Sequence, residues 1–313
     1  MWPASCSTIR RCVLPISVAP DHQRVPAVAA ALLAALLFGT TGTILVNAPH
    51  GADAYSVGFL RLTVGGVTLF AIARRRPPTR VVPLHLLGAF GVAVFQCGYF
   101  VAVERTGVAV GTVVTIGSGP ALAGVIESVR RRRLPTLPWL AGMAVSVAGV
   151  ALLGISGRAT EVDLAGIALG VLAGLGWATF SASGKHLIDS GHDSTYTMAV
   201  FFSGGAVLMA PWLATHSPAW AWSPNGALVA GLLGVATVGV AYTSYGWALR
   251  HLPAPTVITL TLLEPITATT LAAVVVHEGI RPAGWGGIAL VLAGLVVTAR
   301  AAVRAVPAST VGP

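Results

Sequence analysis

Residues 254–276, APTVITLTLLEPITATTLAAVVV, decide the fold class. The run carries one charged residue, Glu264, and an α-helix needs about 20 apolar residues to cross the hydrocarbon core of a bilayer. At about 1.5 Å of rise per residue, Glu264 stands roughly 15 Å into the run, near the middle of the membrane. The stretch therefore predicts a membrane-spanning helix with an acid at its centre.

Similar apolar runs fill most of the remaining chain, and glycine, proline and charged residues mark their ends. The connections between them are short and leave no room for a soluble domain. We therefore predict an all-α integral membrane protein. Its ten predicted spans are residues 27–46, 54–73, 81–103, 108–128, 137–156, 163–184, 195–214, 225–249, 254–276 and 284–303.

The composition agrees with a membrane protein. Charged residues make up only 9% of the chain, whereas an ordinary soluble domain carries about 25%. Glycine, which membrane helices favour, occurs 37 times. The net charge of +9 comes from arginines clustered between apolar runs. That distribution favours determinants of membrane topology over a nucleic-acid surface, so the lipid bilayer is the expected partner and no nucleic acid is expected.

Positive charges sort to one side of the predicted spans. With the N-terminus in the cytoplasm, fifteen of the 19 Lys and Arg residues fall in cytoplasmic segments, three fall outside and Arg61 falls within a span. Lys and Arg gather on the cytoplasmic side of membrane proteins. We therefore expect a multi-pass plasma-membrane protein whose tails, residues 1–26 and 304–313, are both cytoplasmic. The three residues expected outside are Arg105, Arg158 and Arg281.

The two halves of the chain repeat. Pairs that align at an offset of 145 residues include Pro120 with Pro265, Gly142 with Gly287, and Gly149 with Gly294. Glycine and proline fix backbone behaviour, so their matches carry weight. The repeats, residues 27–156 and 163–303, hold five predicted helices each, so the second must enter the membrane from the opposite side. This predicts two inverted repeats, as in many secondary transporters.

Short motifs occur in a fixed order along these repeats. They are Phe38-Gly39, Arg61, Trp177-Ala178, Tyr245-Gly246-Trp247-Ala248-Leu249, Pro253-Ala254, Leu263-Glu264-Pro265 and His277-Glu278. In this order the chain resembles the EamA-type ten-helix members of the drug/metabolite transporter superfamily over residues 27–303. It departs from them at Arg133, where the family has an acidic residue. The resemblance implies a carrier of a small metabolite or drug, most often an exporter.

Glu264 and Pro265 are the expected centre of a substrate-binding site. A carboxylate in mid-membrane costs about 2.5–3.5 kcal/mol, so it should face a wet cavity or a partner. Pro265 has no N–H to donate to the carbonyl of Thr261, and an unpaired carbonyl at that depth needs a neighbour, water or ligand. The alternative is a buried, protonated Glu264 that bonds to a threonine such as Thr261 and has only a structural role.

Other candidate substrate-binding residues lie on neighbouring spans. Arg61 would hold an anionic part of the substrate, or it would extend its long side chain to the membrane interface. Aromatic and amide side chains would line a cavity, or they would pack in the core or in an interfacial belt. These further candidates are Gln96, Tyr99, Trp177, Tyr242 and Tyr245.

The fourth predicted span contains the repeat mate of Pro265. Pro120 follows Gly117 and Gly119, and these residues should loosen the helix near its middle. Broken helices at matching places in two repeats indicate the binding site of a transporter. A packing kink is the alternative. Gly117, Gly119, Pro120 and Pro265 are therefore the candidate hinge residues.

No sequence pattern indicates catalysis, a metal site or a cofactor. The histidines and aspartates at 186–193 fit the ends of helices better than a metal centre. An integral-membrane enzyme would need clustered acids or a His pair at one depth, and a receptor would be expected to carry a soluble domain. We expect a secondary transporter that works by alternating access, with export favoured over import. Coupling to a proton at Glu264 or to no ion, and a monomer or a homodimer, stay open.

Overall fold

The computed structural model describes residues 21–74, 82–155, 163–275 and 282–304, and these form helices joined by turns and short loops. In chain order they are α1 (Asp21–Gly39), α2 (Thr41–Leu45), α3 (Ala54–Ala73), α4 (Pro83–Arg131), α5 (Leu137–Ile155), α6 (Leu164–Asp189), α7 (Ser194–Met209), the 3-10 helices η1 (Ala210–Ala214) and η2 (Pro218–Trp222), α8 (Pro224–Gly234), the π-helix η3 (Val235–Val240), α9 (Ala241–His251), α10 (Ala254–Leu260), the 3-10 helix η4 (Thr261–Leu263), α11 (Glu264–Val275) and α12 (Pro282–Arg304).

The described residues contain nine helical stretches that are long and apolar enough to cross a membrane, and a shorter apolar helix at Leu137–Leu152. Four of the nine stretches join consecutive elements: α1 with α2, α7 with η1, α8 with α9 through η3, and α10 with α11 through η4. The predicted span at 54–73 coincides with α3, because Asp53 and Arg74 bound its apolar run. The prediction of an all-helical, multi-pass membrane protein is thus confirmed. Arg158, Arg281 and His277-Glu278 lie outside the described residues.

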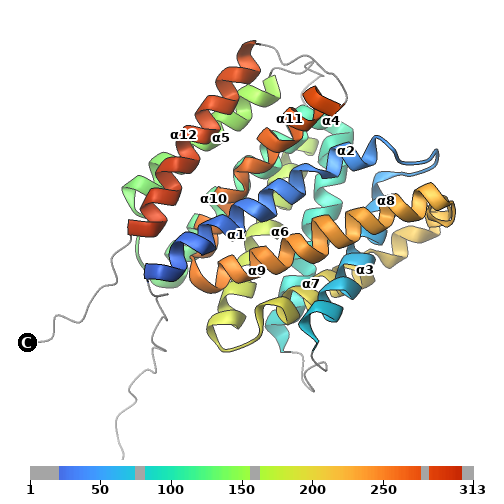
Figure 1. The fold of residues 1–313 in the computed structure, drawn as a ribbon, viewed down its shortest axis with the longest axis horizontal. Coiled ribbons are helices and arrows are strands. Elements are labelled where there is room, and N and C mark those ends of the chain that lie inside the picture. The colour runs from blue at the N-terminus through green and yellow to red at the C-terminus, as the bar shows by residue number, and fades with distance from the viewer. Residues whose placement is uncertain (1–20, 75–81, 156–162, 276–281, 305–313) are drawn as a thin grey trace, which may run out of the picture.

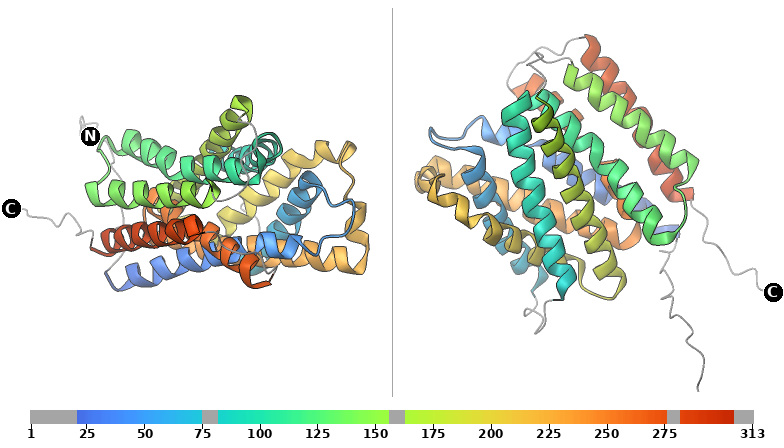
Figure 2. Two further views of the ribbon diagram at one scale, coloured as in Figure 1. Left: turned by 90° about the horizontal axis from the view of Figure 1, so that it is seen from above. Right: turned by 180° about the vertical axis from the view of Figure 1, so that it is seen from behind.

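The longest helix, α4, is two membrane spans. A straight helix of 49 residues would be about 74 Å long, more than twice the thickness of the hydrocarbon core. The Tyr99 hydroxyl instead lies 3.1 Å from that of Thr112, and Gly111 lies against the backbone of Val103. The chain therefore reverses between the spans Pro83–Thr106 and Val110–Arg131, which Figure 2 shows as separate neighbouring helices.

The first helix begins earlier than the sequence predicts. Residues 21–26 were expected in the tail, but α1 starts at Asp21 and includes Pro26. Pro26 is the sixth residue of the helix, so its missing N–H leaves one intrahelical hydrogen bond unmade. Arg24 also donates a hydrogen bond of 3.2 Å to the carbonyl of Val303. This bond holds the start of α1 beside the end of α12, so these two helix ends lie on one side of the bundle.

Asp53 fixes the start of α3 on the opposite side. Its carboxylate accepts hydrogen bonds from the backbone N–H groups of Tyr55 and Ser56 and from the Ser56 hydroxyl. Burial alone would raise the pKa of Asp53, but these bonds together hold it below its ordinary value. Ser56 in turn accepts a bond of 2.9 Å from the indole of Trp220 in η2. The cap therefore ties two distant segments together.

Glycines let the helices approach closely. α5 and α12 lie side by side at one edge of the bundle (Figure 1). A Cβ on Gly142 would stand 2.9 Å from the carbonyl oxygen of Gly294, and one on Gly149 would stand 2.8 Å from that of Gly287. Rising numbers on α5 pair with falling numbers on α12, so the two helices run antiparallel. Small residues at such crossings are typical of membrane helices.

The other helices pack against one another in pairs and small groups. α3 packs against α7, α6 packs against α4, and α1 packs against α9, α10 and α11. Large apolar side chains such as Val67, Phe90 and Val207 are exposed on the outside. A soluble protein would not leave so much apolar surface in water, but lipid accepts it. Figure 1 shows α1 crossing in front of α6, with α9 and α10 beside it.

Candidate functional site

The ninth span is interrupted directly before Glu264. α10 ends at Leu260, the 3-10 helix η4 occupies Thr261–Leu263, and α11 begins with Glu264 followed by Pro265. The carbonyl of Thr261 was expected to stay unpaired, but the Glu264 N–H donates to it. In a 3-10 turn the hydrogen bond spans three residues instead of four. The N–H of Glu264 therefore reaches the Thr261 carbonyl, to which Pro265 cannot donate. The interruption therefore needs no ligand to be stable.

The end of α1 packs against this interruption. A Cβ on Gly39 would overlap the side chain of Thr267 and stand 2.9 Å from the carbonyl oxygen of Glu264. Phe38, the preceding residue, places its ring 4.9 Å from that of Tyr242 and 6.5 Å from that of Tyr245. The aromatic-small pair at 38–39 therefore brings α1, α9 and α11 together at one level.

Glu264 is surrounded by protein atoms yet keeps part of its surface accessible. The Thr261 hydroxyl donates to the carbonyl of Ile258, so the predicted structural alternative, in which Thr261 bonds to Glu264, lacks its hydrogen bond. Arg61 lies within electrostatic range of Glu264. No ion pair joins the two side chains in the described part of the chain, so the carboxylate and the guanidinium both keep capacity for another partner.

Arg61 stays inside the bundle. Its Nε is buried and, within the described residues, has no hydrogen-bond partner. Its charge acts on the hydroxyls of Tyr99 and Tyr242 as well as on Glu264. A buried donor without a partner costs roughly 1–3 kcal/mol. A polar or anionic ligand would remove that cost, which favours the predicted binding role over extension to the interface.

Tyr99 and Tyr242 flank the Arg61–Glu264 pair from two helices. Tyr99 in α4 stacks on Phe95, with ring centroids 6.2 Å apart and planes at 17°. Tyr242 in α9 lies 4.0 Å from Phe202 by ring centroids. Both hydroxyls are within electrostatic range of the two charges. The structure therefore gathers four of the seven predicted binding residues in one place.

Tyr245 and Trp177 form a neighbouring, more deeply buried group. The Tyr245 hydroxyl lies 2.6 Å from that of Ser181, and the side chain of Trp177 lies close to it. The ring of Trp177 lies 5.8 Å from that of Phe95. Both side chains are buried in the interior of the bundle, next to the four residues gathered around Glu264.

Gln96 lies on the same side of α4 as Tyr99, one turn earlier. Its Nε2 would be 3.1 Å from a Cβ built on Gly58. Gly58 precedes Arg61 by one turn of α3, so Gln96 approaches the helix that carries the arginine. Gln96 itself is buried, with 4% of its surface exposed, and it holds α3 against α4 beside the site.

The two candidate hinges differ. α4 stays α-helical through Gly117, Gly119 and Pro120, so the break predicted there is absent. Gly119 packs on the indole of Trp177, and Gly117 on Val147 of α5. The helix is therefore packed on two sides next to the proline. The interruption of the second repeat at η4 therefore has no counterpart in the first.

Sequence reasoning missed several residues of the site. Phe95 precedes Tyr99 by one helical turn, and that spacing could have indicated it. Phe180 and Phe202 complete the aromatic cluster around Tyr242, but only the tertiary structure brings their helices together. The π-helix η3, which ends two residues before Tyr242, also has no sequence signal. Such irregular turns are frequent at functional sites.

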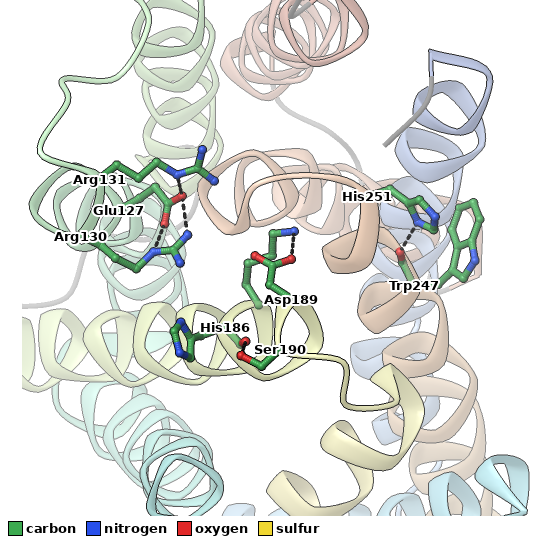
Figure 3. A network of polar contacts seen from close by, with 9 residues as sticks. Glu127, Arg130, Arg131, His186, Asp189, Ser190, Trp247 and His251 are labelled. Atoms are coloured by element: carbon green, nitrogen blue, oxygen red, sulfur yellow. Dashed lines mark hydrogen bonds and ion pairs between the residues drawn. The ribbon is translucent and has the colours of Figure 1, made fainter. Parts of the chain in front are cut away.

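A second polar cluster lies away from this site, where α4 and α6 end (Figure 3). Glu127 pairs with Arg130 at 2.9 Å and with Arg131. Lys185 pairs with Asp189 at 2.7 Å, and Asp193 caps α7 by accepting from the N–H of Tyr196. Within the described residues no three His, Cys, Asp or Glu side chains are placed to hold a metal ion.

Comparison with known proteins identifies a family of similar sequences. A model of the EamA-like transporter family matches the chain twice, over residues 25–155 and 164–300. The chain is also 32% identical over 274 residues to the "Uncharacterized transporter YwfM" of Bacillus subtilis (strain 168), covering 86% of this chain and 92% of that protein.

A solved crystal structure has the same fold. It superposes with a TM-score of 0.77 at 19% sequence identity, over 89% of this chain and 98% of the other. At this identity the likeness concerns the path of the backbone and not the ligand. The overall arrangement of the helices is therefore shared with an experimentally determined protein.

Proposed function

Because the chain belongs to the EamA-like transporter family, we propose that it is a secondary transporter that exports a small metabolite or drug by alternating access. The observation that carries the proposal is the interruption at η4. It places Glu264 in the interior within electrostatic range of Arg61 and beside two tyrosines. Such interrupted helices at mid-membrane are where transporters of this general plan bind their substrates.

The packing of α5 on α12 supports two inverted repeats. The sequence offset of 145 residues carries Gly142 onto Gly287 and Gly294 onto Gly149. Two contacts between α5 and α12 are present, Gly142 with Gly294 and Gly149 with Gly287. Replacing each residue of the first contact by its repeat mate gives the second contact. A two-fold axis within the membrane plane would produce this exchange of contacts between equivalent antiparallel helices.

The sidedness of the chain supports cytoplasmic termini in the plasma membrane. Arg24 meets Val303 on one side, where Arg130 and Arg131 also lie. On the other side Arg105 pairs with Asp163 at 3.3 Å, and this pair is exposed. The excess of arginine at the first side is the charge bias that faces the cytoplasm in membrane proteins.

The chemistry of the site suggests how a substrate is held. The Arg61 guanidinium would bind an anionic group, and the rings of Tyr99 and Phe95 would cover an apolar part. Glu264 would exchange a coupling proton or bind a polar group of the substrate. The 3-10 turn η4 and the π-helix η3 are irregular segments on either side of α9, and they would absorb the change in helix angle between the two access states.

Arg61→Lys should lower transport about tenfold while the amount of folded protein stays constant. Lysine keeps the positive charge but loses the planar fork that binds a carboxylate or phosphate through two hydrogen bonds, and about 1.4 kcal/mol is tenfold. The measurement is flux in proteoliposomes over a panel of metabolites and drugs, with wild type used to identify the transported solute.

Arg105→Lys is the matched control, because this arginine is exposed and lies at the end of the bundle. It should transport at the wild-type rate. Undiminished flux with Arg61→Ala would confine Arg61 to a structural role and would remove it from the proposed site.

A further inference from the structure

A cavity of about 270 Å³ opens at the end of the bundle where α12 ends. It lies between the end of α4, the start of α5, the start of α10 and the end of α12. Glu264 and Arg61 do not line it, so it is separate from the proposed transport site. Its polar lining includes Ser128, Arg131 and Arg133.

The cavity has an excess of positive charge. Residues 130–133 are four consecutive arginines. Glu127 pairs with Arg130 and Arg131 (Figure 3), and no other acid lines the cavity. Arg133 lines it and has no ion-pair partner in the described part of the chain. One carboxylate therefore faces two lining guanidiniums, and the arrangement fits an anion better than a cation.

Trp139 supplies a second, independent indication of a ligand. Its side chain lines the cavity with 7% of the residue exposed. Its six-membered ring packs on Gly124. The indole N–H, however, is buried without a hydrogen-bond partner among the described residues. Buried donors are normally paired, so this N–H is available to an acceptor that enters the cavity.

The surroundings of the cavity are apolar and face outward. Leu134 is 90% exposed and Leu137 is 78% exposed, and both are next to the arginines in sequence. A free anion in water would gain nothing from these leucines. A phospholipid would, because its acyl chains can lie along them while its headgroup remains level with the arginines.

We propose that this cavity binds the headgroup of an anionic phospholipid from the leaflet that faces it. Arg133 and Arg131 would contact the phosphate, Trp139 would donate its N–H to a headgroup oxygen, and the acyl chains would pass over Leu134 and Leu137. The cytoplasmic leaflet, where the proposed topology puts this end, is rich in anionic lipids. The site does not depend on what the central site transports.

The test is native mass spectrometry of the full chain released from neutral detergent. Phosphatidylglycerol and phosphatidylcholine with the same acyl chains are added at equal amounts. The wild type should retain phosphatidylglycerol in preference. Arg133→Gln should reduce that retention about fivefold, the effect of removing one cation at an anionic surface. Arg132→Gln, which changes a neighbouring arginine that does not line the cavity, should stay within about twofold of wild type.

Trp139→Phe provides a second variant that keeps the ring and removes the N–H. It should weaken retention of phosphatidylglycerol about threefold or more, and its melting temperature in neutral detergent shows whether it folds. Equal loss with Arg132→Gln and Arg133→Gln would mean diffuse attraction and would overturn the site. Full displacement of phosphatidylglycerol by the same molar amount of inorganic phosphate would identify a free-anion site instead, and would equally overturn the proposal.

Discussion

Replacing Glu264 by glutamine should reduce transport at least about tenfold without reducing the amount of folded protein. Glutamine has nearly the shape of glutamate, so the contact of Thr267 in α11 with Gly39 in α1 remains. It carries no charge, cannot exchange a proton and does not attract Arg61. Any dependence of transport on pH should therefore flatten. Flux of the identified solute in proteoliposomes, measured across a range of pH, records both effects.

Glu104→Gln is the control for this variant, because Glu104 is an exposed acid near the end of the first span of α4. It should behave as wild type. If Glu264→Gln transports at the wild-type rate with the wild-type pH profile, then Glu264 is a structural residue and the assignment of the site is wrong.

Gly294→Ala should destabilise the protein by about 1–3 kcal/mol, the usual cost of overpacking. The added methyl group would stand 2.5 Å from the carbonyl oxygen of Gly142 and 2.6 Å from the backbone nitrogen of Ser146. Both are backbone atoms, so α5 and α12 would have to move apart. A lowered melting temperature in detergent, with loss of folded protein at growth temperature, is the expected result.

Gly231→Ala is the matched control in another membrane helix. Nothing lies within 4 Å of a Cβ at that position, so alanine should leave stability unchanged or raise it by up to about 1 kcal/mol through its better helix propensity. The repeat mate of Gly294, Gly149, should respond to alanine as Gly294 does, because it faces the same crossing from the other helix. Equal melting temperatures for Gly294→Ala and Gly231→Ala would contradict the close packing of α5 on α12.

The spans were predictable because the membrane imposes a length on each apolar run. The run bounded by Asp53 and Arg74 gave α3 without error. Local irregularities were harder to predict. Pro265 is preceded by a 3-10 turn, whereas Pro120 is accommodated in a continuous helix. The two prolines differ in what packs against them, such as the indole of Trp177 beside Gly119, and tertiary contacts of this kind are not visible in a local sequence.

The site was predictable only as a set of separate candidates. The depth of Glu264 followed from counting residues along one span. Its position near Arg61 depends on how α3 and α11 are placed, and these helices are about 200 residues apart in the chain. The unpaired Nε of Arg61 and the aromatic contacts of Phe202 likewise required the packed structure. The chemical character of the side chains indicated the candidate residues, and the packing of the helices determined which candidates lie close together.

The central claim is that the site beside Glu264 opens to each side of the membrane in turn. Tyr99→Cys tests it directly, because Tyr99 lies at the site and keeps part of its surface accessible. The measurement is labelling by a membrane-impermeant maleimide in right-side-out and in inverted vesicles. Ser190→Cys and Ser217→Cys, at exposed positions on opposite sides, serve as controls. The background carries serine at all native cysteines, Cys6, Cys12 and Cys97.

The cysteine at position 99 should react in both vesicle orientations. The cysteine at 190 should react only in inverted vesicles, where the cytoplasmic face is outward, and the cysteine at 217 only in right-side-out vesicles. Reaction at position 99 from one face alone, with both controls behaving as expected, would show a pocket closed at one end and would contradict transport by alternating access.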